Sequence, residues 1–239
     1  MAFWPIWAWY AVRMQDGSDE PWGLLGLATL VFFLASEGRR QEGSLLYPTL
    51  FTLAYALGLP FLPPLLSAGL AVTAMAATVS RVRFGMGLHP GVWGLALLSL
   101  PLLSSLQFYL GYPLRVATGE GAALMVRWAG FPVECVGTVL SWAGRTVAVD
   151  APCSGVRMLW GALYLTFSLA CFCDWKPRRM LAGAVFAVAA VLLGNVFRSA
   201  SLFFLEVGVL RFPAWVHQGT GLVVFAAVAA AIVWFGSRR

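Results

Sequence analysis

The chain has 239 residues, of which 60% are hydrophobic and 11% charged, with 16 Lys+Arg against 10 Asp+Glu. A soluble domain of this size carries about a quarter charged residues and could not bury such an apolar excess, so soluble globular, disordered and coiled-coil classes are excluded. The net charge of +6 lies in short clusters between apolar stretches, which indicates membrane topology signals rather than a surface for nucleic acid.

The chain begins with a tryptophan-rich stretch, 3–12, that is too short to span a bilayer and predicts an interfacial helix. Seven apolar stretches follow that are long enough, or nearly so, to cross a membrane as helices. Pro101 is expected to kink the fourth of them. The seven predicted spans are 21–36, 45–62, 65–79, 91–110, 155–173, 179–197 and 218–236.

Basic clusters predict the orientation of these spans. With seven spans, all four clusters fall on one side of the membrane and an acidic N-terminal segment falls on the other. By the positive-inside rule the basic side is cytoplasmic, so the N-terminus is outside and the C-terminus inside. The basic residues are Arg39, Arg40, Arg81, Arg83, Lys176, Arg178, Arg179, Arg238 and Arg239, and the acidic ones are Asp16, Asp19 and Glu20.

The segment 111–152, between the fourth and fifth spans, is then extracytoplasmic. Its first part, 113–130, mixes charged and apolar residues, which predicts an amphipathic helix in the outer interface. In its second part, 133–149, two β-branched runs flank Ala143-Gly144, which predicts a small β-hairpin. The predicted fold is therefore an all-α polytopic membrane protein with about seven transmembrane helices, an outer interfacial helix and an extracytoplasmic hairpin.

Three polar residues are predicted to meet at the outer membrane boundary. Cys153 begins the fifth span, where a helix N-terminus and nearby arginines favour the thiolate. Arg198 ends the sixth span, and His217 opens the seventh as the natural base for a cysteine nucleophile. The alternatives are that Cys153 is a buried apolar residue or forms a disulfide with Cys135, that Arg198 snorkels, and that His217 is only solvated.

Further residues near this boundary have less specific signals. Arg157 lies one turn after Cys153, where it either stabilises an oxyanion or pairs with Asp150 or Glu206, and Asn195 shares a helix face with Arg198. Spacing alone does not choose between the two arginines. His89 is expected in a cytoplasmic loop, and Cys171 and Cys173 are expected to be packing residues. Their C-x-C spacing lacks a second ligand cluster, so no metal site is predicted.

These motifs resemble those of the exosortase/archaeosortase family of membrane transpeptidases. That family has a Cys-Ser-Gly segment heading one transmembrane helix, an Asn-x-x-Arg element ending the next and a His before the last. The corresponding segments here are Cys153-Ser154-Gly155, Asn195 to Arg198, and His217. The resemblance covers about 101–235 and includes the Gln107-Phe-Tyr109 stretch. Many members have an acidic residue two positions before the cysteine, whereas Asp150 is three before it here.

The resemblance implies a Cys153–His217–Arg198 triad and favours Arg198 over Arg157 as the oxyanion-stabilising residue. Arg157, Asn195, Asp150 and Ser154 would be supporting or substrate-orienting residues. The substrates would be exported proteins that end in a short motif, a transmembrane helix and a basic tail, as in PEP-CTERM proteins. The acceptor would be a polysaccharide or a lipid, and no metal or organic cofactor is needed.

The chain is thus expected to be a single integral membrane domain over 1–239, with N-terminal helices in 1–110 and the catalytic part in 111–239. It is expected in the cytoplasmic (inner) membrane, surrounded by lipids, with no nucleic-acid partner and with its active site on the outer face. A rhomboid-like intramembrane protease would need Gly-x-Ser-Gly, whereas this chain has Pro152-Cys-Ser-Gly155. A transporter would place polar residues at midspan, and a non-enzymatic scaffold would tolerate loss of Cys153.

Overall fold

The structure is a computed structural model that describes residues 3–15, 21–36, 44–150, 154–208, 213 and 215–238, with the backbone alone at 215, 217 and 218. Cys153 and the acidic residues Asp16, Asp19 and Glu20 lie outside the described residues, as do Arg39, Arg40 and Arg239. The described part forms helices α1 (Trp4–Gln15), α2 (Trp22–Ala35), α3 (Leu46–Gly58), α4 (Pro64–Phe84), α5 (Pro90–Leu98), α6 (Leu103–Trp128), α7 (Val156–Phe172), α8 (Pro177–Glu206) and α9 (Trp215–Ser237), and strands β1 (Glu134–Val136), β2 (Val139–Trp142) and β3 (Arg145–Ala148).

The chain is mostly helical, and each of the seven predicted stretches corresponds to one helix or, for the fourth, to the broken pair α5 and α6. Within the described residues, α4, α8 and the 219–237 part of α9 are long and apolar enough to cross a membrane, which makes three candidate spans, or up to four if the broken pair is one span. The helices α2, α3 and α7 are shorter apolar helices. The total of seven spans stays a prediction.

The fourth predicted span differs from the structure. The helix stops at Leu98 and starts again at Leu103, so Pro101 interrupts it rather than kinking it. From Leu103 a single helix of 26 residues runs through Pro113 to Trp128. The separate interfacial helix predicted for 113–130 is therefore the second half of α6. An internal proline removes one helical hydrogen bond, and helices in lipid tolerate this where neighbouring groups pack around the break.

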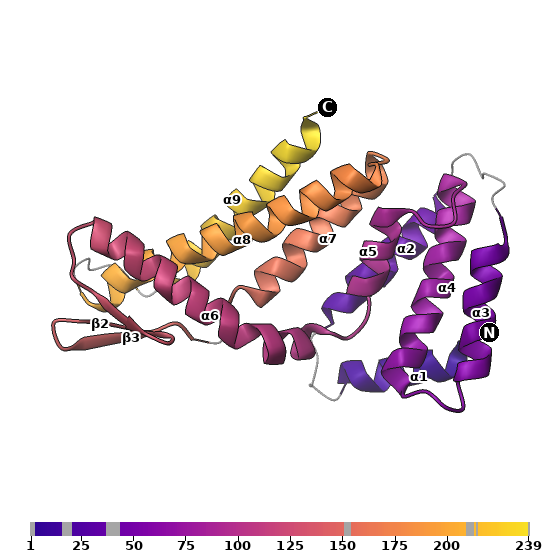
Figure 1. Ribbon diagram of the computed structural model, residues 1–239, viewed down its shortest axis with the longest axis horizontal. Helices are drawn as coiled ribbons and strands as arrows, with labels where there is room; N and C mark the ends of the chain where they lie inside the picture. The colour runs from indigo at the N-terminus through magenta and orange to yellow at the C-terminus, as the bar shows by residue number, and fades with distance from the viewer. Residues whose placement is uncertain are drawn as a thin grey trace. The chain divides into compact units, whose positions relative to one another are not determined.

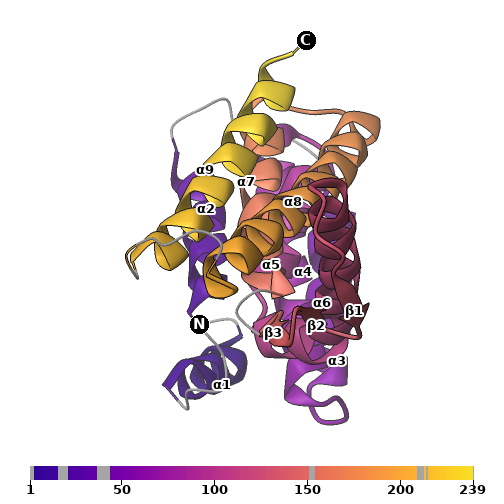
Figure 2. The same cartoon turned by 90° about the vertical axis from the view of Figure 1, so that its left-hand side faces the viewer.

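The segment after α6 folds into three antiparallel strands in the order β1-β2-β3, where the sequence predicted a two-stranded hairpin (Figure 2). Ala143 and Gly144 join β2 to β3 with φ values of 48° and 77°, and positive φ at both turn residues suits a tight hairpin turn. Strand β1 was missed because it has only three residues, among them a glutamate and a cysteine.

The described chain forms two compact units, each treated by itself. The C-terminal unit comprises Ser105–Leu163 and Gly183–Arg239. In it the sheet, α6 and α8 lie together (Figure 1). Apolar residues of these elements form one core, to which the sheet contributes Leu140 and α8 contributes Phe203. Arg145 of β3 donates a hydrogen bond to the carbonyl oxygen of Val207, just after α8 ends, where a cation also complements the helix dipole.

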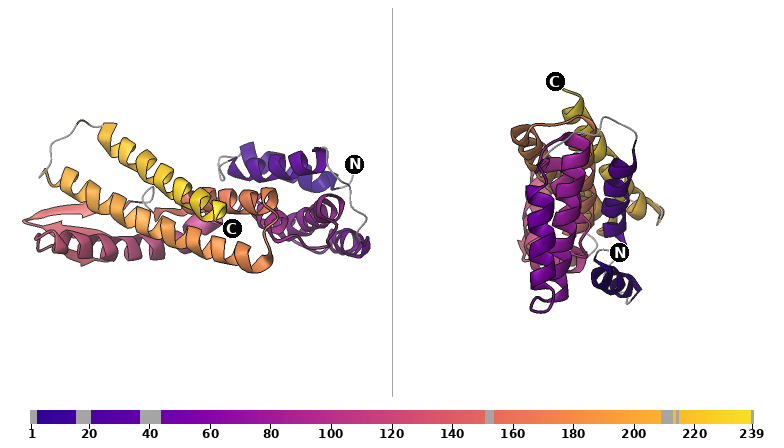
Figure 3. Two further views of the ribbon diagram at one scale, coloured as in Figure 1. Left: turned by 90° about the horizontal axis from the view of Figure 1, so that it is seen from above. Right: turned by 90° about the vertical axis from the view of Figure 1, so that its right-hand side faces the viewer.

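Helix α9 packs along α8 in the same unit (Figure 3). A Cβ atom on Gly194 would lie 2.9 Å from methyl groups of Val224 and Val228, so the small residue permits close approach of the two helices. Further along, the rings of Phe186 and Phe235 stack with centroids 5.0 Å apart. The close α8–α9 contact brings the first turns of α9 beside the end of α8.

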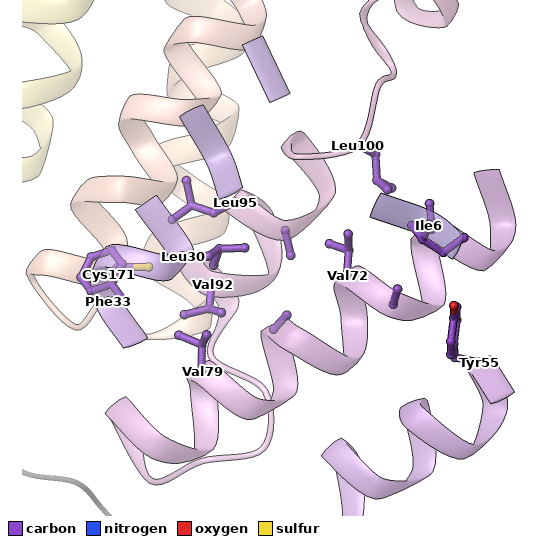
Figure 4. Packing of buried hydrophobic residues seen from close by; sticks show 14 residues of the cluster. Ile6, Leu30, Phe33, Tyr55, Val72, Val79, Val92, Leu95, Leu100 and Cys171 are labelled. Atoms are coloured by element: carbon purple, nitrogen blue, oxygen red, sulfur yellow. The ribbon is translucent and has the colours of Figure 1, made fainter. Parts of the chain in front are cut away.

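The N-terminal unit comprises Met1–Ser104 and Tyr164–Ala182. Its core includes Leu30 of α2, Val79 of α4, Leu95 of α5 and Cys171 of α7, all almost fully buried (Figure 4). Helix α1 docks through Tyr10, whose hydroxyl donates a hydrogen bond of 2.8 Å to the carbonyl oxygen of Ser99. That carbonyl lies where α5 ends, so a side chain satisfies an orphan acceptor of the broken helix.

Two helical glycines test how tightly α2 packs. A Cβ on Gly23 would overlap the Tyr10 hydroxyl and lie 2.6 Å from the Ser99 carbonyl oxygen, whereas a Cβ on Gly69 of α4 meets nothing within 4 Å. We expect Gly23→Ala to destabilise the protein by about 1–3 kcal/mol, because overpacking outweighs the helix-propensity gain.

Gly69→Ala is the matched control and should leave stability unchanged or raise it by about 0.5–1 kcal/mol. The measurement is thermal unfolding of both variants in detergent by intrinsic fluorescence. Equal melting temperatures for Gly23→Ala and Gly69→Ala would contradict the close packing of α1, α2 and α5.

Candidate functional site

The described residues of the predicted site lie in the C-terminal unit, in the segment between β3 and α7 and on α7, α8 and α9. Cys153 belongs to that segment but lies outside the described residues. Ser154 is buried, and its hydroxyl donates a hydrogen bond of 3.0 Å to Oε1 of Gln107 on α6. The same hydroxyl accepts from the backbone N–H of Val156 at 3.4 Å. Ser154 therefore caps the first turn of α7 and holds the motif segment to α6.

Gly155 is required by its backbone and by its neighbour. Its φ is +78°, a conformation that glycine adopts at no steric cost. A Cβ at this position would lie 3.1 Å from Nδ2 of Asn195 on α8, which is tighter than an ordinary contact. The glycine of the Cys-Ser-Gly segment thus lets the chain turn into α7 while the Asn195 amide lies against its backbone.

Asn195 is a polar side chain in the middle of the 30-residue helix α8 and is 1% exposed. Its Nδ2 donates a hydrogen bond of 3.1 Å to Oγ1 of Thr118 on α6, and Thr118 is equally buried. Burying an amide costs several kcal/mol unless hydrogen bonds replace its water. The Asn195–Thr118 pair consequently orients α8 against α6.

Arg198 lies three residues after Asn195, on the same side of α8. Its half-buried guanidinium packs against α9: a Cβ on Gly221 would lie 3.3 Å from Nε and 3.5 Å from Cζ of Arg198. Position 217, which is His217, precedes Gly221 by four residues and so shares its face of α9 one turn earlier. The Arg198 guanidinium and the backbone of His217 therefore belong to the same end of the α8–α9 pair.

The structure also locates the other predicted site residues. Arg157 is on the first turn of α7 and Asp150 follows β3, and both are exposed. The structure brings Ser154 and Gly155 together with Asn195. In a second group, Arg198 lies against Gly221 of α9, one turn after position 217. It does not describe the sulfur of Cys153 or the imidazole of His217.

A small cavity of about 20 Å³ adjoins the motif segment. Ser154, Gly155 and Asn195 line it on one side, and apolar residues of α6, α7 and α8 line the rest. Its volume is that of a single water molecule, and the only polar side chains among the described residues that line it are those of Ser154 and Asn195.

Cys135, the other cysteine near this region, is a free thiol. It donates a weak hydrogen bond to the carbonyl oxygen of Gly137, 3.7 Å away. Burial raises the pKa of the Cys135 thiol, the nearby Glu120 carboxylate raises it further, and Arg127 opposes the shift. A raised thiol pKa lowers the thiolate fraction at neutral pH, so Cys135 is a poor nucleophile.

His89, expected as a loop residue on the cytoplasmic side, lies in the connection before α5 and is the N-cap of that helix. Its side chain is 0% exposed, and its Nδ1 accepts the backbone N–H of Val92, a buried role that the sequence pattern did not predict. Its Nε2 lies 3.3 Å from Oδ1 of Asp174. A histidine can serve as a helix N-cap, but the surrounding sequence does not reveal that Asp174, 85 residues away, will cover it.

Two residues that support the site, Thr118 and Gly221, were not predicted, and Gln107 was named only as part of the Gln107-Phe-Tyr109 stretch without a role. Gln107 and Thr118 are eleven residues apart, which is about three turns, so both face the same side of α6. That spacing of polar residues in an apolar helix was the available signal. Gly221 gave none, because its role depends on where the Arg198 side chain points. Among the described residues no group of three His, Cys, Asp or Glu side chains could hold a metal ion.

Together these features define a polytopic helical membrane protein whose polar motif residues meet where α6, α8 and the start of α7 pack. A family model described as transmembrane exosortase matches residues 1–234, so the chain belongs to the transmembrane exosortase family. This confirms the resemblance found in the sequence. The family is generally one of membrane cysteine transpeptidases. No curated protein and no solved structure matches the chain.

A pair of glycines isolates the contact between Gly155 and Asn195. Gly155 and Gly144 have nearly equal φ values, 78° and 77°, but a Cβ on Gly144 meets nothing within 4 Å. Both alanine variants carry the backbone strain of about 1–2 kcal/mol, and Gly155→Ala alone also pushes against the Asn195 amide. We expect Gly155→Ala to lower the melting temperature more than Gly144→Ala does.

The same measurement in an Asn195→Ala background tests the cause, because the difference between the two glycine variants should shrink when the amide is removed. An undiminished difference would show that another contact is responsible.

Proposed function

We propose that this chain is a membrane cysteine transpeptidase that cleaves the C-terminal sorting signal of exported proteins and transfers them to an acceptor. The proposal rests on one observation beyond family membership. Gly155 of the Cys-Ser-Gly segment lies against Asn195, and Arg198, one turn later on α8, packs against Gly221 of α9, four residues after position 217. Three motif elements from distant parts of the sequence thus share one unit, as a catalytic site requires.

In the proposed first step, the Cys153 thiolate attacks the scissile carbonyl carbon of the substrate. A C–S bond forms and the carbonyl oxygen becomes an oxyanion, which the Arg198 guanidinium stabilises. The oxyanion then collapses, the C–N bond breaks, and protonated His217 gives its proton to the leaving amine. The product of this step is a thioester between Cys153 and the substrate.

In the second step, His217 removes a proton from the nucleophilic group of the acceptor, which attacks the thioester carbon. The C–S bond breaks, and the thiolate of Cys153 is regenerated. With water as the acceptor the same sequence of steps is hydrolysis. A polysaccharide or a lipid acceptor gives transfer.

The remaining motif residues have supporting roles in this proposal. Asn195 and Ser154 hold the nucleophile segment through Thr118 and Gln107, so they position Cys153 rather than react. The exposed Arg157 and Asp150 orient the incoming substrate. The site faces the outside of the cytoplasmic membrane, where the motif of an exported substrate with a transmembrane helix and a basic tail would emerge.

A processing assay tests the proposal. A tagged protein with a C-terminal motif, transmembrane helix and basic tail is co-expressed with wild type, Cys153→Ala, Arg198→Ala or His217→Ala. We expect wild type to remove the tail and each variant to lose at least about 100-fold in rate, because each removes a nucleophile, an oxyanion partner or a general acid.

Cys135→Ala is the matched control and should process normally, because its thiol stays protonated. Membrane levels and melting temperatures of all variants are measured in parallel. Cleavage that persists in well-folded Cys153→Ala would rule out the nucleophile.

Gly221 offers a second test, one that leaves all three proposed catalytic residues in place. Its missing side chain makes room for the Arg198 guanidinium, so Gly221→Val should displace that group and lower the processing rate by about tenfold or more. Valine is no worse than glycine as a helix former, so α9 itself should persist.

Ala226→Val, at an exposed position of the same helix, is the control and should process at the wild-type rate. A normal rate for Gly221→Val would contradict a role for the Arg198–α9 contact.

A further inference from the structure

A cavity of about 390 Å³ in the N-terminal unit lies where three helices end. Helix α2 ends at Ala35, α4 at Phe84 and α7 at Phe172, and residues of all three ends line the cavity. Each helix C-terminus carries about half a negative charge on its unpaired carbonyls. The volume is within the range of small-molecule sites. This cavity is therefore large enough for a ligand group, and the helix ends contribute partial negative charge to a lining that also contains Arg83.

Asp174 adds a full negative charge at the same place. It follows the end of α7 with a φ of +48°, and the N–H of Trp175 bonds the carbonyl oxygen of Ala170 at 2.9 Å, as in a glycine-type helix end. Glycine adopts this conformation without strain, and an acidic side chain at a helix C-terminus is electrostatically unfavourable. Asp174 thus carries two local costs, and strained residues of this kind cluster at functional sites.

The contact between Asp174 and His89 does not neutralise this carboxylate. His89 Nδ1 accepts from Val92, so Nε2 carries the hydrogen that reaches Oδ1 of Asp174 over 3.3 Å. Burial lowers the pKa of His89 more strongly than Asp174 raises it, so the imidazole is neutral. Among the described residues no lysine or arginine forms an ion pair with Asp174, whose side chain is 73% exposed. The Asp174 carboxylate thus accepts a hydrogen bond from His89 and is otherwise largely exposed.

Aromatic rings form the rest of the wall. The ring of Phe33 lies 5.0 Å from that of Phe172 and 5.7 Å from that of Phe32, between centroids, and Phe84 stacks on His89 at 3.8 Å. Figure 4 shows Phe33 beside Cys171 in the buried part of this wall. Phenyl faces attract cations, which adds to the pull of Asp174. Phe32 and Phe172 are 54% and 62% exposed, so apolar surface continues from the cavity toward lipid.

Arg83, in the last turn of α4, lines the same cavity as Asp174 and offers a partner for an anion there. The cavity therefore combines a cation-binding part, an arginine for an anion and an exposed apolar margin. We propose that it binds the headgroup of a phospholipid that carries a primary ammonium group, with the ammonium on Asp174 and the phosphate on Arg83. A phospholipid suits all three features, because its acyl chains would cover the exposed rings of Phe32 and Phe172.

Native mass spectrometry of the purified full-length protein tests this site. The protein is reconstituted in phosphatidylcholine vesicles doped with equal amounts of phosphatidylethanolamine and phosphatidylglycerol, then released in mild detergent. We expect wild type to retain one phosphatidylethanolamine about tenfold or more over phosphatidylglycerol, because only the former brings an ammonium to the carboxylate.

Asp174→Gly and Asp174→Asn should both lose this preference. In Asp174→Gly the relief of backbone strain is opposed by the loss of the acceptor for the buried Nε2 of His89, so the melting temperatures of both Asp174 variants are measured in parallel to establish that they are folded. Arg83→Gln should retain less of both phospholipids. Glu134→Gln, which removes an exposed carboxylate from β1 in the other unit, is the matched control and should keep the wild-type preference.

Equal retention of the two phospholipids by wild type would overturn the proposal, as would an unchanged preference in both folded Asp174 variants. Retention that depends on Arg83 alone would show a site for phosphate without the ammonium, and would overturn it as well. The proposal is independent of the cysteine chemistry, because neither the cavity nor its test involves Cys153.

Discussion

The C-terminal unit depends on one buried amide. Asn195 lies in the middle of an apolar helix, where its polar atoms cannot reach water, so the helix must place that side chain against partners. It meets Thr118 of α6 on one side and the backbone of Gly155 on the other. This one interaction orients α6, α8 and the beginning of α7 relative to each other, and the register it sets decides where Arg198 lies.

A charged side chain near the membrane boundary needs a defined environment as well. Arg198 lies half-buried against α9 because Gly221 leaves its flank open, and a larger residue there would push the guanidinium away. The short distance between α8 and α9 comes from a second glycine, Gly194, which faces Val224 and Val228. Small residues at the α8–α9 contact thus permit close helix packing and also leave space for the Arg198 guanidinium.

The N-terminal unit shows the opposite balance. Its core is apolar, and two of its polar contacts lie at the ends of one helix, where Tyr10 covers the end of α5 and His89 covers its start. Asp174 stands apart from this pattern, because it holds an unfavourable backbone conformation and places a negative charge beside three helix C-termini. Glycine would relieve the backbone strain at this position, but it would also leave the buried Nε2 of His89 without its acceptor, so the aspartate serves the fold as well as the proposed ligand.

Composition and hydropathy determined the membrane class and located all the apolar stretches, because lipid demands long runs of apolar helix whatever their packing. The ordered motifs around Cys153, Asn195, Arg198 and His217 likewise identified the family from the chain alone. The sequence pattern was a poorer guide to where elements begin and end. It predicted a separate helix from Pro113, although α6 continues through this proline, and it did not predict the three-residue strand β1.

Only the tertiary structure decided which side chains meet. The pairing of Ser154 with Gln107, of Arg198 with the face opened by Gly221, and of His89 with Asp174 joins residues 47, 23 and 85 positions apart. Such contacts depend on the relative rotation and distance of whole helices. Hydropathy predicts that a helix lies in lipid, but it says little about how the helix is rotated about its own axis. A single hydrogen bond, or a glycine that permits close approach, favours one rotation over the others.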